Sequence, residues 1–104
     1  MVTKVRPFAL VAGLLALMGA GAQAQPARVV SMNLCTDQLA MLLAAPGQLI
    51  SVSDLAQDPR SSAMAKEARA YHVNHAGAEE IFLMQPDLVL AGSYSDGATL
   101  SMLE

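Results

Sequence analysis

The side chains best suited to covalent chemistry in this chain are one cysteine and two histidines. Cys35 is expected at the start of a helix, where the helix dipole favours a thiolate. With His72 or His75 as its base, such a thiolate would make a small exported hydrolase. No glycine-flanked nucleophile turn surrounds Cys35, and a buried apolar role is commoner for a lone cysteine. We keep the Cys35 hydrolase as an alternative and expect that the chain is not an enzyme.

The two histidines could instead bind a metal or a haem iron. His72 and His75 stand three positions apart, and Tyr71 precedes them. Two histidines without further cysteines or paired acids are a weak pattern for a metal site. Residues 71 to 76 are expected to form an irregular loop facing solvent. We therefore expect no metal site and no cofactor of the protein's own.

Polar segments follow each strand that the sequence predicts. Short apolar runs typical of buried strands occupy residues 29–32, 49–52 and 88–91. The segments after them, residues 33–36, 53–55 and 92–96, are polar and rich in side chains that hydrogen-bond. Ligands of open parallel sheets bind beyond the carboxyl ends of the strands. Turn and helix-cap roles would explain any one of these residues, but the cluster as a whole predicts a binding edge.

Helices are expected between and after these strands. They are predicted over residues 35 or 36 to 45, 61 to 70, 78 to 84, and from 95 or 96 to the end of the sequence. Strands that alternate with helices imply right-handed crossovers and a parallel, Rossmann-like α/β sheet. Three strands are few for such a sheet, and no strand follows the last helix, so we expect an incomplete lobe. A non-functional truncated fragment is a further alternative to a working protein.

The beginning of the chain is typical of an export signal. Lys4 and Arg6 precede an uncharged apolar run over residues 8 to 22, and Ala22 and Ala24 form the small-x-small pattern of a cleavage site. The run is about fifteen residues long, shorter than the ~20 of a membrane-spanning helix. We expect a signal peptide over 1–24, cleavage between Ala24 and Gln25, and a periplasmic domain over 25–104.

The charge of this expected mature chain limits its partners. Four basic and nine acidic side chains remain after residue 24, which gives a formal net charge of −5. An acidic chain without a basic cluster argues against nucleic acid and anionic membrane surfaces as partners. A single cysteine cannot form an internal disulfide. We expect a monomer.

Three stretches resemble a known family, the substrate-binding proteins of ABC importers for cobalamin, ferric siderophores and haem. They read RVVSMNLCTDQLAMLLA, LISVSDLAQDP and AEEIFLMQPDLVLAGSYSD. The last is the most specific, since family members tend to read E-x-[IL]-x-x-x-x-P-D-L-V there. The resemblance covers residues 28 to 104 and implies the N-terminal lobe of a two-lobed protein that holds its ligand between the lobes.

The resemblance also implies roles for particular residues. It implies an iron chelate, haem or cobalamin as the ligand, so that iron or cobalt belongs to the cargo, and an inner-membrane permease as partner. Glu79 matches an acidic residue that meets arginines of the permease in cobalamin-binding members. Val73 stands where some members stack an aromatic ring on the corrin, whereas Tyr71 and His75 would suit an iron chelate or haem. The residues implied to face the ligand are Asn33, Leu34, Cys35, Ser53, Asp54, Val73, Asn74, His75, Ser93 and Tyr94.

Overall fold

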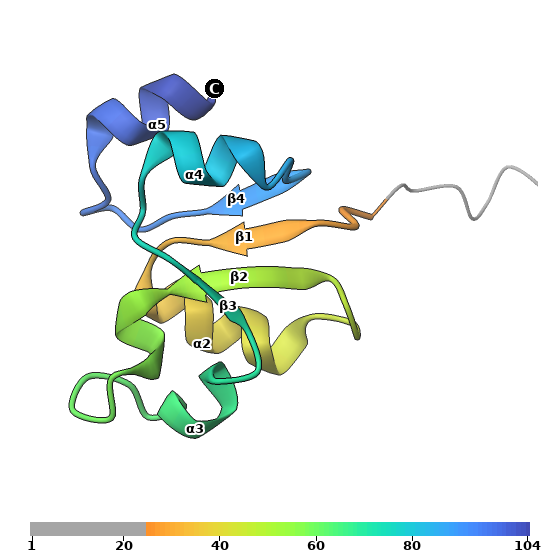
Figure 1. Cartoon of the computed structure of the whole chain (residues 1–104), viewed down its shortest axis with the longest axis vertical. Helices are drawn as coiled ribbons and strands as arrows, with labels where there is room; N and C mark the ends of the chain where they lie inside the picture. Colours follow the sequence, from red (N-terminus) through yellow and green to blue (C-terminus); the bar gives the residue numbers. More distant parts are fainter. Residues whose placement is uncertain (1–24) are drawn as a thin grey trace, which may run out of the picture.

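The protein forms a four-stranded parallel sheet with helices on both faces (Figure 1). The computed structural model describes residues 25–104, so the predicted signal peptide, with the Ala24 side of its cleavage site, lies outside the described residues. The strands run in the order β3-β2-β1-β4. This arrangement confirms the predicted α/β fold. Within residues 25–104, no helix has the length and apolar character to cross a membrane.

Three strands lie where the apolar runs predict them. They are β1 (Val29–Ser31), β2 (Leu49–Ser53) and β4 (Leu88–Leu90). β1 is one of the two interior strands, because it pairs with β2 on one side and with β4 on the other. Its residues are buried throughout, as expected for a parallel strand covered on both faces.

The fourth strand corrects a prediction. Residues 71 to 76 are not an irregular loop, because β3 (His72–Asn74) pairs in parallel with β2. The sequence His-Val-Asn has too little apolar character to signal a strand, since β3 is an edge strand whose first residue is exposed. The strand forms because it pairs with β2, although its own sequence has little strand character. The Ser51 hydroxyl, which donates to the His72 carbonyl at 2.9 Å, strengthens this pairing.

The helices agree with the sequence except between β2 and β3. The confirmed helices are α2 (Leu34–Leu43), α4 (Ala78–Leu83) and α5 (Gly97–Leu103), although α2 begins slightly earlier and ends two residues earlier than predicted. The helix predicted over 61–70 is present only as the short α3 (Ala65–Ala68), and an additional 3-10 helix, η1 (Asp54–Gln57), precedes it. Side chains compete with the helix there, since Asp58 accepts from the Arg60 N–H and Ser62 from the Met64 N–H.

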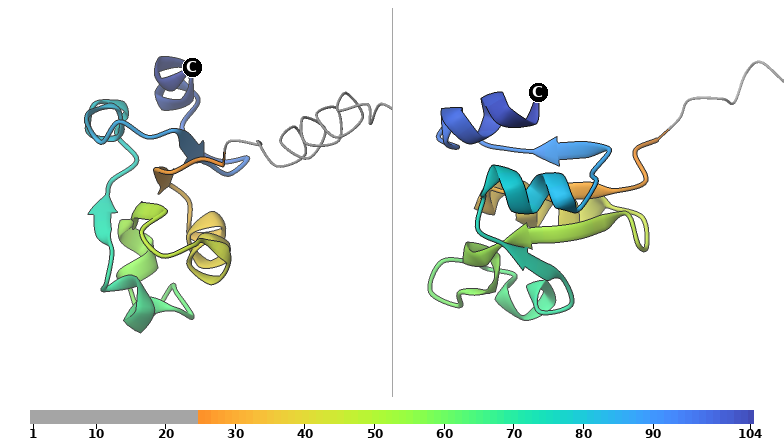
Figure 2. Two further views of the ribbon diagram at one scale, coloured as in Figure 1. Left: turned by 90° about the vertical axis from the view of Figure 1, so that its right-hand side faces the viewer. Right: turned by 45° about the horizontal axis from the view of Figure 1, so that its top comes forward.

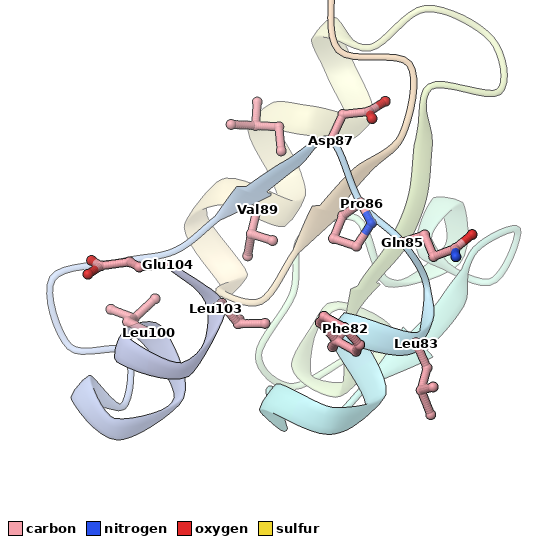
Figure 3. A pocket seen from close by; sticks show the side chains of 10 residues that line it. Phe82, Leu83, Gln85, Pro86, Asp87, Val89, Leu100, Leu103 and Glu104 are labelled. Atoms are coloured by element: carbon pink, nitrogen blue, oxygen red, sulfur yellow. The ribbon is translucent and has the colours of Figure 1, made fainter.

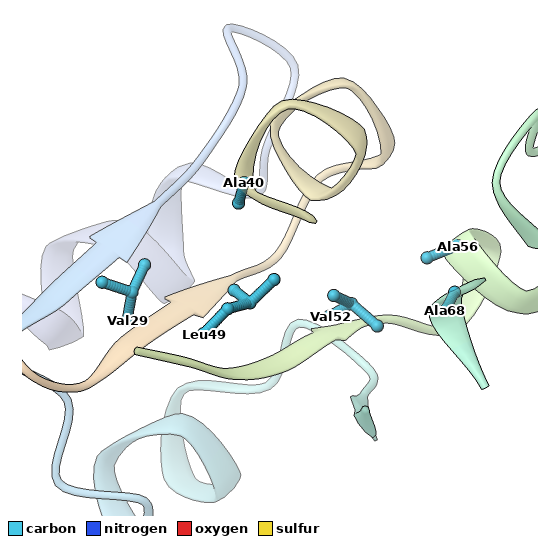
Figure 4. Packing of buried hydrophobic residues seen from close by; sticks show 6 residues of the cluster. All are labelled: Val29, Ala40, Leu49, Val52, Ala56 and Ala68. Atoms are coloured by element: carbon cyan, nitrogen blue, oxygen red, sulfur yellow. The ribbon is translucent and has the colours of Figure 1, made fainter. Parts of the chain in front are cut away.

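Two apolar clusters hold the helices to the sheet. On one face Val29, Leu49 and Val52 pack against small alanines of α2, η1 and α3 (Figure 4). On the other face Val30 and Met32 pack with Ile81 of α4, and residues of α5 lie against that cluster. α2 and α3 therefore cover the opposite face from α4 and α5 (Figure 2).

Candidate ligand-binding edge

The parallel sheet brings all the strand-end segments to one edge. β1, β2 and β4 point the same way in Figure 1, and β3 is parallel to β2. The chain steps outward from β1 to β2 and β3, and then returns to place β4 on the other side of β1. The switch point therefore lies between the ends of β1 and β4, the position where such sheets bind ligands.

Asn33 and Gly92 meet at this switch point. The Asn33 side chain caps α2 by accepting from the Cys35 N–H at 3.0 Å. A Cβ atom on Gly92 would lie 2.5 Å from Asn33 Nδ2, so only glycine allows this approach. The Gly92 N–H in turn donates to the Ser95 hydroxyl at 2.9 Å. The loops after β1 and β4 are thus packed together at the base of the edge.

Several predicted ligand-facing residues project from this base. Cys35, Asp54, His75, Ser93 and Tyr94 are exposed, and Tyr94 is fully so at 101%. The exposure of Cys35 also shows that a buried apolar role for it is wrong. Leu34 and Val73 are half-buried. The free side chains therefore come from segments that follow all four strands.

Two other predicted residues, Ser53 and Asn74, point into the protein. The Ser53 N–H and hydroxyl both donate to the buried Asp37 carboxylate at the start of α2. The Asn74 amide donates to the Ser31 and Val52 carbonyls and to the Ser51 hydroxyl, at 2.8 to 3.0 Å. The hydrogen bonds of both side chains hold the ends of the strands in place.

Sequence reasoning missed this buried polar layer. Its central member, Asp37, lies in the first turn of α2 and is fully buried. The available signal was serine within otherwise apolar strands, since Ser31 and Ser51 are both fully buried and hydrogen-bonded. The described residues leave no buried side-chain nitrogen or oxygen without a partner. The layer makes a rigid support for the edge.

The segment after β3 is organised by Glu80. Its Oε1 accepts from the backbone N–H groups of His75 and Gly77, and its Oε2 lies 3.7 Å from His75 Nδ1. Partial burial acts to raise the pKa of Glu80, but the backbone N–H groups of Gly77 and His75 outweigh it, so the pKa lies below its usual value. The neighbouring Glu79, the predicted permease contact, is exposed on α4.

The candidate nucleophile and its candidate bases belong to strands that are not neighbours in the sheet. Cys35 follows β1, whereas His72 lies on β3 and His75 follows it, with β2 in between. His75 faces Glu80. Among residues 25–104, no group of three or more histidine, cysteine or acidic side chains could hold a metal ion.

A separate groove, lined by both apolar and polar side chains, lies along the outer side of β4 (Figure 3). Its volume is about 660 Å³, and it is bounded by the last turns of α4 and α5. None of the predicted ligand-facing residues lines it.

Comparison of this chain with protein-family models, with curated proteins and with solved structures found no match.

Proposed function

We propose that this chain is the N-terminal lobe of a periplasmic substrate-binding component of an ABC importer. It contributes one wall of a cleft for an iron chelate, haem or cobalamin and delivers that cargo to an inner-membrane permease. The observation that carries the proposal is the shared edge, where exposed side chains from four parallel strand ends stand on a fully bonded polar base. The resemblance of the sequence to this class of binding protein supplies the ligand and the partner.

The breadth of the edge suits a large ligand. His75 and Tyr94 follow the two outermost strands, and Asp54 and Cys35 follow the two strands between them. Three strand spacings make this edge roughly 14 Å wide. A tyrosine ring offers a flat apolar surface with a polar tip. A broad, flat metal chelate matches this surface better than a small metabolite would.

The motif E-x-[IL]-x-x-x-x-P-D-L-V, on which the resemblance mainly rests, has a structural role in the lobe. Pro86 follows α4, and the Asp87 carboxylate accepts from the backbone N–H groups of Ala27 and Arg28 at 3.0 and 2.9 Å. These bonds fix the start of β4 beside the start of β1. The motif therefore sets the position of the two strands whose far ends form the switch point.

Delivery of the cargo to the permease requires a second surface of the lobe, and we assign its negative charge to Glu79. Glu80 is held by His75 and Gly77, which leaves Glu79 as the exposed acid of that pair. An exposed carboxylate adds little affinity but steers association with a basic partner. Glu79 is the residue that we assign to the permease contact.

A titration with haem, cobalamin and a ferric siderophore tests the proposal. A ligand pocket normally covers most of its ligand, so one wall should bind weakly, with a Kd of about 0.1 mM or above. Tyr94→Ala should weaken binding about three- to tenfold, because it removes a contact surface of the edge. The matched control is Phe82→Ala, which removes an aromatic side chain of the groove and is expected to leave binding unchanged.

Two results would count against this proposal. One is the absence of binding by all three ligands at the highest soluble concentrations. The other is binding that Phe82→Ala weakens and Tyr94→Ala does not.

A further inference from the structure

Carboxylates stand along the ligand-binding edge of the sheet. Asp54 follows β2, Asp96 lies after β4 at the start of α5, and both are exposed. Glu80, in the first turn of α4, lies against the segment after β3 through its bonds to the His75 and Gly77 N–H groups. Three of the four strand ends therefore have an acidic side chain beside them.

Two of these carboxylates are stabilised in their charged form. Asp96 accepts from the N–H and the hydroxyl of Thr99, both at 2.9 Å, and these bonds hold the pKa of Asp96 below its usual value. The pKa of Glu80 is lowered as well. Both groups therefore contribute negative charge to the edge at neutral pH.

The basic side chains of residues 25–104 do not offset this charge. Arg28 precedes β1 at the opposite end of the sheet, and its guanidinium donates to carbonyls just after α4. Arg60 pairs with Asp58, with 3.5 Å between Nε and Oδ1. Lys66 and Arg69 belong to the α3 segment that leads into the start of β3. Within the described part of the chain, no lysine or arginine belongs to the segments that directly follow the four strands.

The helix N-termini at this edge already have acceptors from the chain itself. Free N–H groups at the start of a helix commonly receive the phosphate or carboxylate of a ligand. Here Asn33 caps α2, Asp96 caps α5, and Glu80 accepts from the N–H groups before α4. The edge therefore offers an anionic ligand neither a basic side chain nor an uncapped helix start.

Asp54 is the acid of the edge that is best placed to meet a ligand. It is exposed, and within residues 25–104 only its Oδ1 has a partner, the Leu55 N–H at 3.0 Å. Its carboxylate can accept from an amide or ammonium N–H of a ligand. A carboxylate or catecholate of a ligand at the same place would meet a like charge, which disfavours binding.

We propose that this edge selects a metal chelate without net negative charge, such as a corrinoid bearing amide groups or a ferric trihydroxamate. It disfavours haem, which carries carboxylates, and anionic catecholate chelates. The selection rests on the proposed function and names the class of cargo within it.

Two matched series of ligands test this selection by charge. The first is a linear ferric trihydroxamate whose terminal amine is free, acetylated or succinylated, so that the complex is cationic, uncharged or anionic. The second is cyanocobalamin with its amides intact or with one amide hydrolysed to a carboxylate. We expect affinity to fall about two- to fivefold with each step toward negative charge at low ionic strength. The difference should shrink above about 0.5 M salt, because salt screens exposed charges.

Variants of the protein locate the charge that selects. Asp54→Asn should narrow the affinity ratio between the cationic and anionic trihydroxamates at least about twofold, because it removes a charge of the edge. The matched control is Glu67→Gln, which removes an exposed charge of α3 and should leave this ratio unchanged.

The possible failures are distinguishable. Equal or tighter binding of the anionic members, or binding of haem alone, would overturn the selection and leave the proposed function standing. A ratio that Glu67→Gln narrows as much as Asp54→Asn would also overturn it, because the net charge of the chain would then be the cause. Absence of binding by both series and by haem would contradict the proposed function and the selection with it.

Discussion

At the residue scale, Asn74 holds the strand ends of the sheet together. Its side-chain NH₂ group donates to acceptors on both β1 and β2, and its side-chain oxygen Oδ1 accepts from the Ala76 N–H at 3.1 Å. The side chain is fully buried. The resemblance implied that Asn74 faces the ligand, and nothing local in the sequence distinguishes an inward from an outward asparagine. That distinction depends on β3, which the sequence did not reveal.

We expect Asn74→Ala to lower the free energy of unfolding by about 2 to 4 kcal/mol, since it leaves buried acceptors without partners. Urea denaturation measures the change. Ser93→Ala, at an exposed position of the edge, is the control and should stay within ~0.5 kcal/mol of the natural chain. A loss below about 1 kcal/mol for Asn74→Ala would show that the bonds contribute little.

Glu80 makes the turn before α4 sensitive to acid. Its pKa is lowered in the folded protein, so its carboxylate adds stability above its unfolded pKa. That stability is lost as the pH falls through the folded pKa. We expect Glu80→Gln to reduce stability at neutral pH and to flatten the fall in stability below about pH 5.

Denaturation across this pH range measures the effect, and Glu79→Gln is the matched control because Glu79 is exposed. Equal pH profiles for Glu80→Gln and the natural chain would rule out this role. The pKa values of Asp58 and Asp96 are also lowered, first by backbone N–H groups of Arg60 and Thr99, so some acid sensitivity should remain in both variants.

At the scale of elements, the sequence predicts well where apolar periodicity is strong and poorly where tertiary contacts decide. Val29 to Ser31 and Leu49 to Ser53 are recognisable because buried parallel strands are largely apolar and rich in β-branched residues. β3 was missed because its pairing with β2, not its composition, makes it a strand. The helix predicted over 61–70 is shortened to Ala65–Ala68, because aspartate and serine side chains bond to the backbone in the turns before it.

The turn from β3 to α4 also carries backbone strain. Ala76 has φ 57°, a left-handed conformation that glycine adopts more readily than alanine. We expect Ala76→Gly to be neutral or to raise the free energy of unfolding by up to about 1 kcal/mol. Ala78→Gly, two residues later in α4, should instead lower it by ~0.5 to 1 kcal/mol. Destabilisation of equal size by both changes, measured by thermal unfolding, would contradict this view of the turn.

At the scale of the whole molecule, two exposed parts of the sheet differ in character: the carboxyl ends of its strands and the outer side of β4. The carboxyl ends of the strands carry exposed polar and aromatic side chains above a bonded polar layer. The groove along the outer side of β4 combines apolar side chains with the polar side chains of Gln85, Asp87 and Glu104. The sequence predicted the first surface, because polar residues follow each apolar run. It did not predict the second, since exposed leucine and phenylalanine positions of helices resemble core positions until the packing is known.

The central claim is that the carboxyl edge of the sheet is one wall of a chelate-binding cleft. The most direct measurement is the mapping of backbone amide shifts by NMR while haem, cobalamin or a ferric siderophore is added. The claim predicts weak binding with the largest shifts in the segments after the four strands, around Cys35, Asp54, His75 and Tyr94, and unchanged amides around Phe82 and Leu103. Shifts confined to the groove beside β4, or no shifts at the carboxyl edge with any of the three ligands, would contradict it.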